Sequence, residues 1–118
     1  MTETASTADI FAALDHALAK RRDADPATSY TAALYAGGTP KISAKITEEA
    51  AEVVDAAGED DTAHLVHEVA DLWFHCMVLL QARGQDVSAV QDELARRFGV
   101  SGHDEKAARP SGNSASRD

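Results

Sequence analysis

The sequence predicts an all-α protein in which the helices pack as a four-helix-type bundle. Apolar residues recur at helical spacing in four main segments, and glycine or proline separates one segment from the next. No segment of useful length alternates apolar and polar residues as a half-buried strand does. Only six of the 118 residues are Phe, Trp or Tyr, so aliphatic side chains must build the core. Such a core suits packed helices.

The expected helices begin and end at residues that favour helix termini. Gly37 and Gly38 stop a short helix, and Pro40 then fits the first turn of the next one. Ser88 and Gln91 form a capping box at the start of the last helix. The expected helices run from Thr7 to about Arg22, Tyr30 to Ala36, Pro40 to Ala57, Asp61 to about Gln81, and Ser88 to Phe98.

Two of these helices carry the main apolar faces. In the helix that starts at Pro40, the side chains expected to be buried are those of Ile42, Ile46, Ala50, Val53 and Ala57. The helix at 61–81 is apolar round most of its circumference, which is typical of a helix buried on all sides. One chain of 118 residues has little to cover such a helix, so we expect a homodimer formed through residues 61–81.

Charge and composition exclude several classes of protein. Eleven Lys and Arg residues against 20 Asp and Glu residues give a net charge of −9, the wrong sign for holding nucleic acid by its phosphates. The 44% hydrophobic and 26% charged composition is globular, and we expect one domain at 1–109 followed by a disordered tail at 110–118. Cys76 is the only cysteine, and neither a secretory signal nor a membrane span is visible, so a cytoplasmic location is expected.

The most informative feature is a set of acidic residues at positions where helix physics disfavours them. Glu48, Glu49 and Glu52 lie within about one turn of the second long helix, where like charges repel one another. Glu68 and Asp71 repeat this arrangement within the most apolar helix. His64 and His75 share their narrow arc, so that helix carries one polar stripe, which must face something polar.

A divalent cation would explain these acids. Buried carboxylates are costly unless they are paired with bases or bind a cation, and the helix at 61–81 contains no Lys or Arg. Carboxylates on facing helices suit Mg²⁺, or alternatively Mn²⁺. The competing interpretation is a solvated acidic face with helical salt bridges, which fits Glu48 better than the apolar surroundings of Glu68 and Asp71. For His64 and His75, structural hydrogen bonding is favoured over metal ligation.

Other metal sites fit less well. The run from His67 to Asp71 differs from the zinc-protease HExxH pattern because Asp71 stands where the second histidine belongs. The Glu-x-x-His pairs of di-iron bundles are absent, since Glu52 follows Glu49 at that spacing and Asp71 follows Glu68. The acidic residues therefore favour a magnesium site over either alternative.

The acidic pattern resembles the EExxE and ExxD signature of the all-α nucleoside triphosphate pyrophosphatases, which include the MazG-type enzymes. Within this superfamily the chain is most similar to the phosphoribosyl-ATP pyrophosphohydrolase family. The resemblance covers roughly Ser29 to Arg109. Besides the acids, it rests on Ser29-Tyr30-Thr31-Ala32, the run from Lys41 to Val53, the run from Leu65 to Leu72, and an SGxxEKAxR motif from Ser101 to Arg109. The Trp73-Phe74 pair and His103 depart from the family pattern.

The resemblance implies a bundle of the MazG-like kind and an enzyme of the second step of histidine biosynthesis. The implied reaction is hydrolysis of phosphoribosyl-ATP to phosphoribosyl-AMP and pyrophosphate, by water attack between the α and β phosphates with Mg²⁺ bound. The implied metal ligands are Glu49, Glu52, Glu68 and Asp71, and Glu48 is implied to be a further ligand or the group that orients or deprotonates the attacking water. Glu48 and Glu49 are the implied catalytic residues. Candidates for binding the substrate phosphates are Lys41, Lys45, Lys106 and Arg109.

Two rival functions stay open on the sequence. A MazG-type pyrophosphatase acting on other nucleoside triphosphates would use the same acids, and substrate profiling would separate it from the implied reaction. A non-enzymatic helical dimerisation module would need no metal. The two lysines near Glu48 also have a second interpretation, because they could instead form ion pairs with Glu48 or Glu49 on the helix surface.

Overall fold

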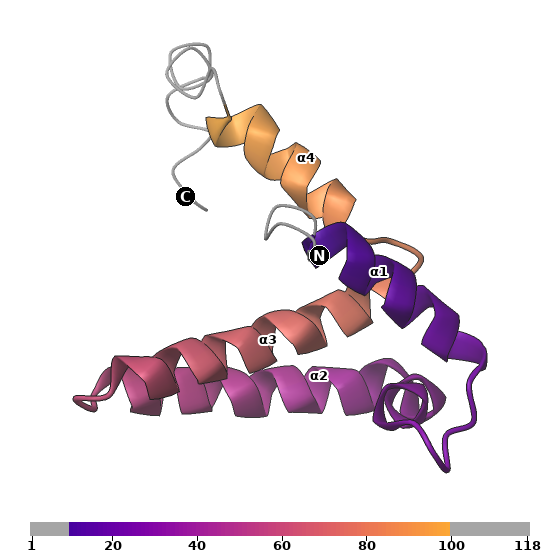
Figure 1. The fold of residues 1–118 in the computed structure, drawn as a ribbon, viewed down its shortest axis with the longest axis horizontal. Coiled ribbons are helices and arrows are strands. Elements are labelled where there is room, and N and C mark those ends of the chain that lie inside the picture. The colour runs from indigo at the N-terminus through magenta and orange to yellow at the C-terminus, as the bar shows by residue number, and fades with distance from the viewer. Residues whose placement is uncertain (1–9, 100–118) are drawn as a thin grey trace, which may run out of the picture. The chain divides into compact units, whose positions relative to one another are not determined.

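A computed structural model of the chain describes residues 10–99, and all regular structure within that range is helical (Figure 1). The all-α prediction is therefore confirmed. The helices are α1 (Ile10–Lys20), a short 3₁₀ turn η2 (Arg21–Asp23), α2 (Tyr30–Ala57), α3 (Thr62–Ala82) and α4 (Val87–Phe98). The expected start of the first helix at Thr7 and the expected tail at 110–118 lie outside the described residues.

The described residues fall into two compact parts, one ending at Val87 and the other beginning at Ser88. The first part holds α1, α2 and α3, and the second holds most of α4. The prediction of a single domain at 1–109 stays a prediction. None of the helices between residues 10 and 99 is long and apolar enough to cross a membrane.

An antiparallel pair of helices, α2 and α3, makes the most extensive contact in the first part (Figure 1). The pair is closed by a short loop, in which Gly58 ends α2 and Asp61 caps α3. The Asp61 carboxylate accepts the backbone N–H of His64 at 3.1 Å, as an N-cap does. Both ends of the loop therefore lie where the sequence placed them.

A kink at Gly38 divides α2 into two helical arms. Gly38 has φ 78° and ψ −177°, a backbone conformation that residues other than glycine rarely adopt. Pro40 follows in the first turn of the second arm. The first arm is capped by Ser29, whose hydroxyl accepts the N–H of Ala32 at 3.1 Å. The expected break between a short helix and a long one is confirmed.

The core lies where α1 and α3 cover the arms of α2. The prediction for the end of α2 is partly wrong, because Ala57 is exposed and Ala56 is buried in its place. Neighbouring residues of a helix point about 100° apart, so Ala56 and Ala57 face different directions. Which of the two is buried at the end of α2 depends on the position of α3. The buried core consists of Leu18, Leu34, Ile42, Met77 and Val78, and Ile46 is partly buried beside them.

A contact across the chain sets the start of α4. Asp15 of α1 accepts the N–H of Val87 through Oδ2 at 2.9 Å, and α4 begins at Val87. The capping-box prediction is wrong by one residue, since Ser88 lies inside the first turn. The side chain of Gln81 donates to the Asp15 carbonyl at 3.4 Å, which links α3 to the same segment of α1.

One side of α3 carries an exposed apolar face. Val66 is 66% exposed and Trp73 is 55% exposed, so a single chain does not cover this helix on all sides, and its full burial in a homodimer stays a prediction. The residues of this α3 apolar face are Leu65, Val66, Val69, Ala70 and Trp73, and they line a shallow depression. The chain itself covers the opposite side, where Glu68, His75, Met77, Val78 and Gln81 are buried.

We predict that Gly38→Ala destabilises the fold by about 1–3 kcal/mol, because alanine is strained at this backbone conformation. Urea unfolding followed by circular dichroism at one fixed protein concentration measures the change. Gly58→Ala is the matched control, since Gly58 has an ordinary φ of −85° and a change within about 0.5 kcal/mol is expected there. Equal stability of the two variants would contradict the prediction.

Candidate metal centre

Three carboxylates meet between α2 and α3. Glu49, Glu52 and Glu68 each offer an oxygen atom, and these oxygens lie within 4.8 Å of one another. Glu49 and Glu68 are buried, with exposed fractions of 7% and 9%, whereas Glu52 lies at the exposed edge of the cluster. The structure thus brings together three of the four predicted metal ligands in one group, which we call the acidic cluster.

The position of the loop in the α2–α3 pair explains why these residues meet. Glu52 lies six residues before the C-cap Gly58, and Glu68 lies seven residues after the N-cap Asp61. In an antiparallel pair, residues at nearly the same distance from the loop lie at about the same level. Glu49 and Asp71 are each one turn farther from the loop, so they form the next level.

Two oxygens of the acidic cluster are buried without a hydrogen-bond partner. They are Oε1 of Glu49 and Oε1 of Glu68, and Oδ1 of Asp15 is the only other such side-chain atom found between residues 10 and 99. Buried polar atoms nearly always have a partner, because losing water without a replacement is costly. The orphaned oxygens, and a donor set made only of carboxylates, fit a hard divalent cation such as Mg²⁺ or Mn²⁺.

The pKa values show the repulsion inside the acidic cluster. Burial raises the pKa of Glu49, and the charges of Glu52 and Asp71 raise it further. The interaction with Glu68 raises the pKa of Glu52. Burial pushes the pKa of Glu68 upward, but its interactions with Glu52 and His64 outweigh burial and leave the pKa below its usual value. The four acids therefore influence one another's ionisation.

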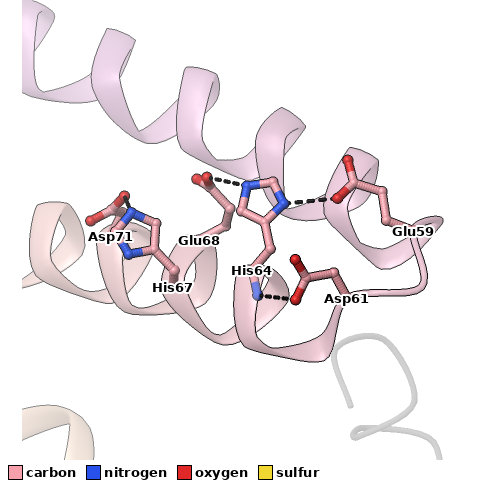
Figure 2. Close-up of polar contacts among 6 residues, drawn as sticks. All are labelled: Glu59, Asp61, His64, His67, Glu68 and Asp71. Carbon is pink, nitrogen blue, oxygen red and sulfur yellow. Dashed lines mark hydrogen bonds and ion pairs between the residues drawn. The ribbon is translucent and has the colours of Figure 1, made fainter.

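Figure 2 shows His64 lying between two carboxylates. Its Nδ1 is 2.8 Å from Oε1 of Glu59, and its Nε2 is 3.0 Å from Oε2 of Glu68. A carboxylate only accepts hydrogen bonds, so both ring nitrogens donate and the ring is an imidazolium. Hydrogen bonds with Glu59 and then Glu68 accordingly raise the pKa of His64.

His67 contacts Asp71 less closely, with Nε2 3.4 Å from Oδ2, and its side chain is mostly exposed (Figure 2). His67, Glu68 and Asp71 form a second group that could hold a cation, and Glu68 belongs to both groups. In the sequence, His67 was a candidate ligand only within the zinc-protease pattern, which the chain does not complete. Its position four residues before Asp71 was the available signal, because residues at this spacing meet on a helix.

His75 is buried and belongs to neither group that could hold a cation. Its Nδ1 donates to the backbone carbonyl of Asp71 at 2.9 Å. Its Nε2 lies 2.9 Å from the hydroxyl oxygen of Tyr30, with which it forms a hydrogen bond. His75 therefore acts as a hydrogen-bonding residue between α2 and α3, and the sequence analysis missed its partner Tyr30.

Glu48 lies outside both groups that could hold a cation. Its side chain is exposed, and Oε1 lies 3.0 Å from Nζ of Lys45. This hydrogen bond raises the pKa of Lys45. Lys41 is exposed on the second arm of α2. The other two predicted phosphate-binding residues, Lys106 and Arg109, lie outside the described residues.

Comparison with known proteins places this site in a family. The family described as phosphoribosyl-ATP pyrophosphohydrolase matches residues 11–98, which include the whole acidic cluster. The chain belongs to this family. A phosphoribosyl-ATP pyrophosphatase of Nitrosospira multiformis is 50% identical over 107 residues, which are 91% of this chain and 88% of the relative. A protein of the same name from Azoarcus sp. is 54% identical over 92 residues, which are 78% of this chain and 86% of the relative.

We predict that Glu49→Gln raises the melting temperature of the metal-free protein at neutral pH by a few degrees. The substitution removes one buried charge, and each like-charged pair on a helix costs about 0.2–0.5 kcal/mol. Thermal unfolding in the presence of a chelator measures the difference from the wild type. Asp55→Asn is the matched control, because Asp55 is an exposed acid on the same helix, and little change is expected for it.

The difference in melting temperature between Glu49→Gln and the wild type should become smaller as the pH falls. The folded-state pKa of Glu49 is raised above the unfolded value of 4.5, so the wild-type carboxyl takes up a proton more readily when folded. The penalty for its charge is fully present above the folded-state pKa and disappears below about pH 4.5. The advantage of Glu49→Gln should shrink as the pH falls through this range. A constant or growing advantage would contradict the assignment.

Proposed function

We propose that this chain hydrolyses phosphoribosyl-ATP to phosphoribosyl-AMP and pyrophosphate, the second step of histidine biosynthesis. The supporting observation is the acidic cluster, in which two buried carboxylate oxygens lack partners, in a chain of the phosphoribosyl-ATP pyrophosphohydrolase family. A cytoplasmic location belongs to the same proposal. A net charge of −9 does not oppose a polyphosphate substrate whose own charge is offset by divalent cations.

The proposed cofactor is Mg²⁺, with Mn²⁺ as an alternative. Glu49, Glu52 and Glu68 would hold it from α2 and α3, and Asp71 would contribute from the next turn of α3. A bound cation of this kind neutralises charge on the phosphates and lowers the pKa of a coordinated water. The burial of Glu49 and Glu68 on facing helices supports this assignment, because it limits the conformations open to two of the proposed ligands.

The residues around the acidic cluster have complementary proposed roles. Glu49 is buried beside the other acids, so it is placed to orient a water molecule as well as to bind a cation. Glu48 precedes it on the exposed side of α2, where its pairing with Lys45 holds an ammonium group close to the cluster. Lys41 and Lys45, together with Lys106 and Arg109, are proposed to bind the substrate phosphates.

We predict that Glu68→Gln lowers Mg²⁺-dependent release of pyrophosphate from phosphoribosyl-ATP by at least about a hundredfold, because a group that stabilises charge in the transition state is lost. Asp55→Asn is again the matched control, since this exposed acid on α2 lies outside the acidic cluster. Near-normal turnover by Glu68→Gln would show that this face of α3 is not the site.

The wild-type protein separates the rival functions in the same assay. Preferential cleavage of other nucleoside triphosphates would favour a MazG-type pyrophosphatase. A calorimetric titration without Mg²⁺ or Mn²⁺ binding would favour a dimerisation module. The orphaned oxygens of Glu49 and Glu68 favour an enzyme that binds a cation over a dimerisation module. They support a MazG-type pyrophosphatase equally, so the family match favours phosphoribosyl-ATP as the substrate.

We also propose that the protein is a homodimer formed through α3. The α3 apolar face leaves Val66 and Trp73 largely exposed in one chain, and contiguous apolar surface of this kind is typical of protein interfaces. A second copy is the proposed occupant, because a two-fold axis across α3 would place the same apolar residues against one another.

Val66→Glu and Trp73→Glu should each shift the protein toward a monomer, because a charge buried at the centre of an apolar interface has no partner. Sedimentation velocity at micromolar concentration measures the effect. Val54→Glu is the matched control: Val54 is a valine 71% exposed on α2 and lies outside the α3 apolar face, so the variant should associate like the wild type. A wild-type protein that sediments as a monomer would refute the proposal.

A further inference from the structure

We propose that His64 is a positioning residue that holds the Glu68 carboxylate in the orientation that binds the cation. The inference rests on the proposed metal site and goes beyond it, because His64 belongs to neither group of side chains that could hold an ion. His64 lies one turn before Glu68 on α3 and contacts its carboxylate (Figure 2).

The His64 ring is fixed at both of its nitrogens. Nδ1 lies 2.8 Å from Oε1 of Glu59, which follows the end of α2, and the backbone N–H of His64 donates to Asp61 at 3.1 Å. Contacts from the loop therefore hold both the start of α3 and the ring. With Nδ1 anchored, Nε2 is left at 3.0 Å from Oε2 of Glu68.

This contact divides the two oxygens of Glu68 between two tasks. Oε2 accepts the hydrogen bond from His64, whereas Oε1 is buried without a hydrogen-bond partner. Figure 2 shows the Glu68 carboxylate directed toward α2, with His64 on the side nearer the loop. Glutamate loses considerable rotamer entropy when it is fixed, so a side chain already held by His64 has less left to lose when a cation binds.

A comparison of His64 with His67 shows the effect of the contact between His64 and Glu59. His67 stands four residues before Asp71 just as His64 stands before Glu68, but its Nε2 is 3.4 Å from the carboxylate. The side chain of His67 is 67% exposed, against 40% for His64. No second carboxylate is found on the His67 ring within the described part of the chain. A histidine four residues before a carboxylate is therefore not enough for a close contact. The second contact of the ring, with Glu59, distinguishes His64 from His67.

The test measures Mn²⁺ binding to the full-length protein by the loss of the free-ion signal in electron paramagnetic resonance. His64→Leu keeps a side chain of moderate size without donors, and it should raise the half-saturating Mn²⁺ concentration about 10- to 100-fold. His64→Gln keeps one donor for Glu68 and should stay within about threefold of the wild type. His16→Leu, at an exposed histidine of α1, is the matched control and should bind like the wild type.

A further variant tests the anchor without touching the ring or the ligand. Glu59→Ala removes the partner of Nδ1 and should weaken Mn²⁺ binding in the same direction as His64→Leu, by a smaller factor. Circular dichroism checks that each variant is folded. If His64→Leu does not fold, His64→Gln and Glu59→Ala decide the question, and wild-type affinity in Glu59→Ala would then overturn the proposal.

The outcomes separate this inference from the proposed function. Unchanged affinity in a folded His64→Leu protein would overturn the positioning role, and tighter binding would overturn it by showing that the charged ring repels the cation. A wild-type protein that binds Mn²⁺ but does not hydrolyse phosphoribosyl-ATP would refute the proposed function alone. A wild-type protein that binds no Mn²⁺ would refute both.

Discussion

The antiparallel register of α2 and α3 is the constraint on which the site depends. Because Glu52 and Glu68 stand at nearly the same distance from the loop, the pair of helices brings them to about one level, and Glu49 and Asp71 follow one turn later. A shift of one residue in this register would turn a carboxylate by about 100° away from its neighbours. The caps at Gly58 and Asp61, which end α2 and begin α3, therefore contribute to the site although neither lies in it.

The acidic cluster opposes the folding that creates it. Glu49 and Glu68 are buried beside other acids, and each keeps one oxygen without a partner, so the cluster alone costs stability. Apolar packing around Ile42, Met77 and Val78 has to offset this cost. Such a conflict between local interactions and the fold is typical of functional sites, where a ligand supplies the missing interaction.

The two sides of α3 have different proposed tasks. One side presents Glu68 to α2, and behind it His75 joins Tyr30 to the backbone of Asp71. The other side carries Val66 and Trp73, the centre of the proposed contact with a second copy. Because both sides belong to one rigid helix, association of two chains would also brace the helix that carries Glu68 and Asp71.

The sequence by itself determined the helical class, most helix ends and the acids that share a turn within each helix, because these follow from local periodicity, glycine and proline chemistry, and spacing along one helix. Only the tertiary structure decided which residues from distant segments became partners. Asp15 caps Val87, Tyr30 reaches His75, and Ala56 is buried in place of Ala57. The physical reason is that crossing angles and side-chain rotamers are set by the packing of whole helices, whereas a periodic pattern specifies only which face of a helix is apolar.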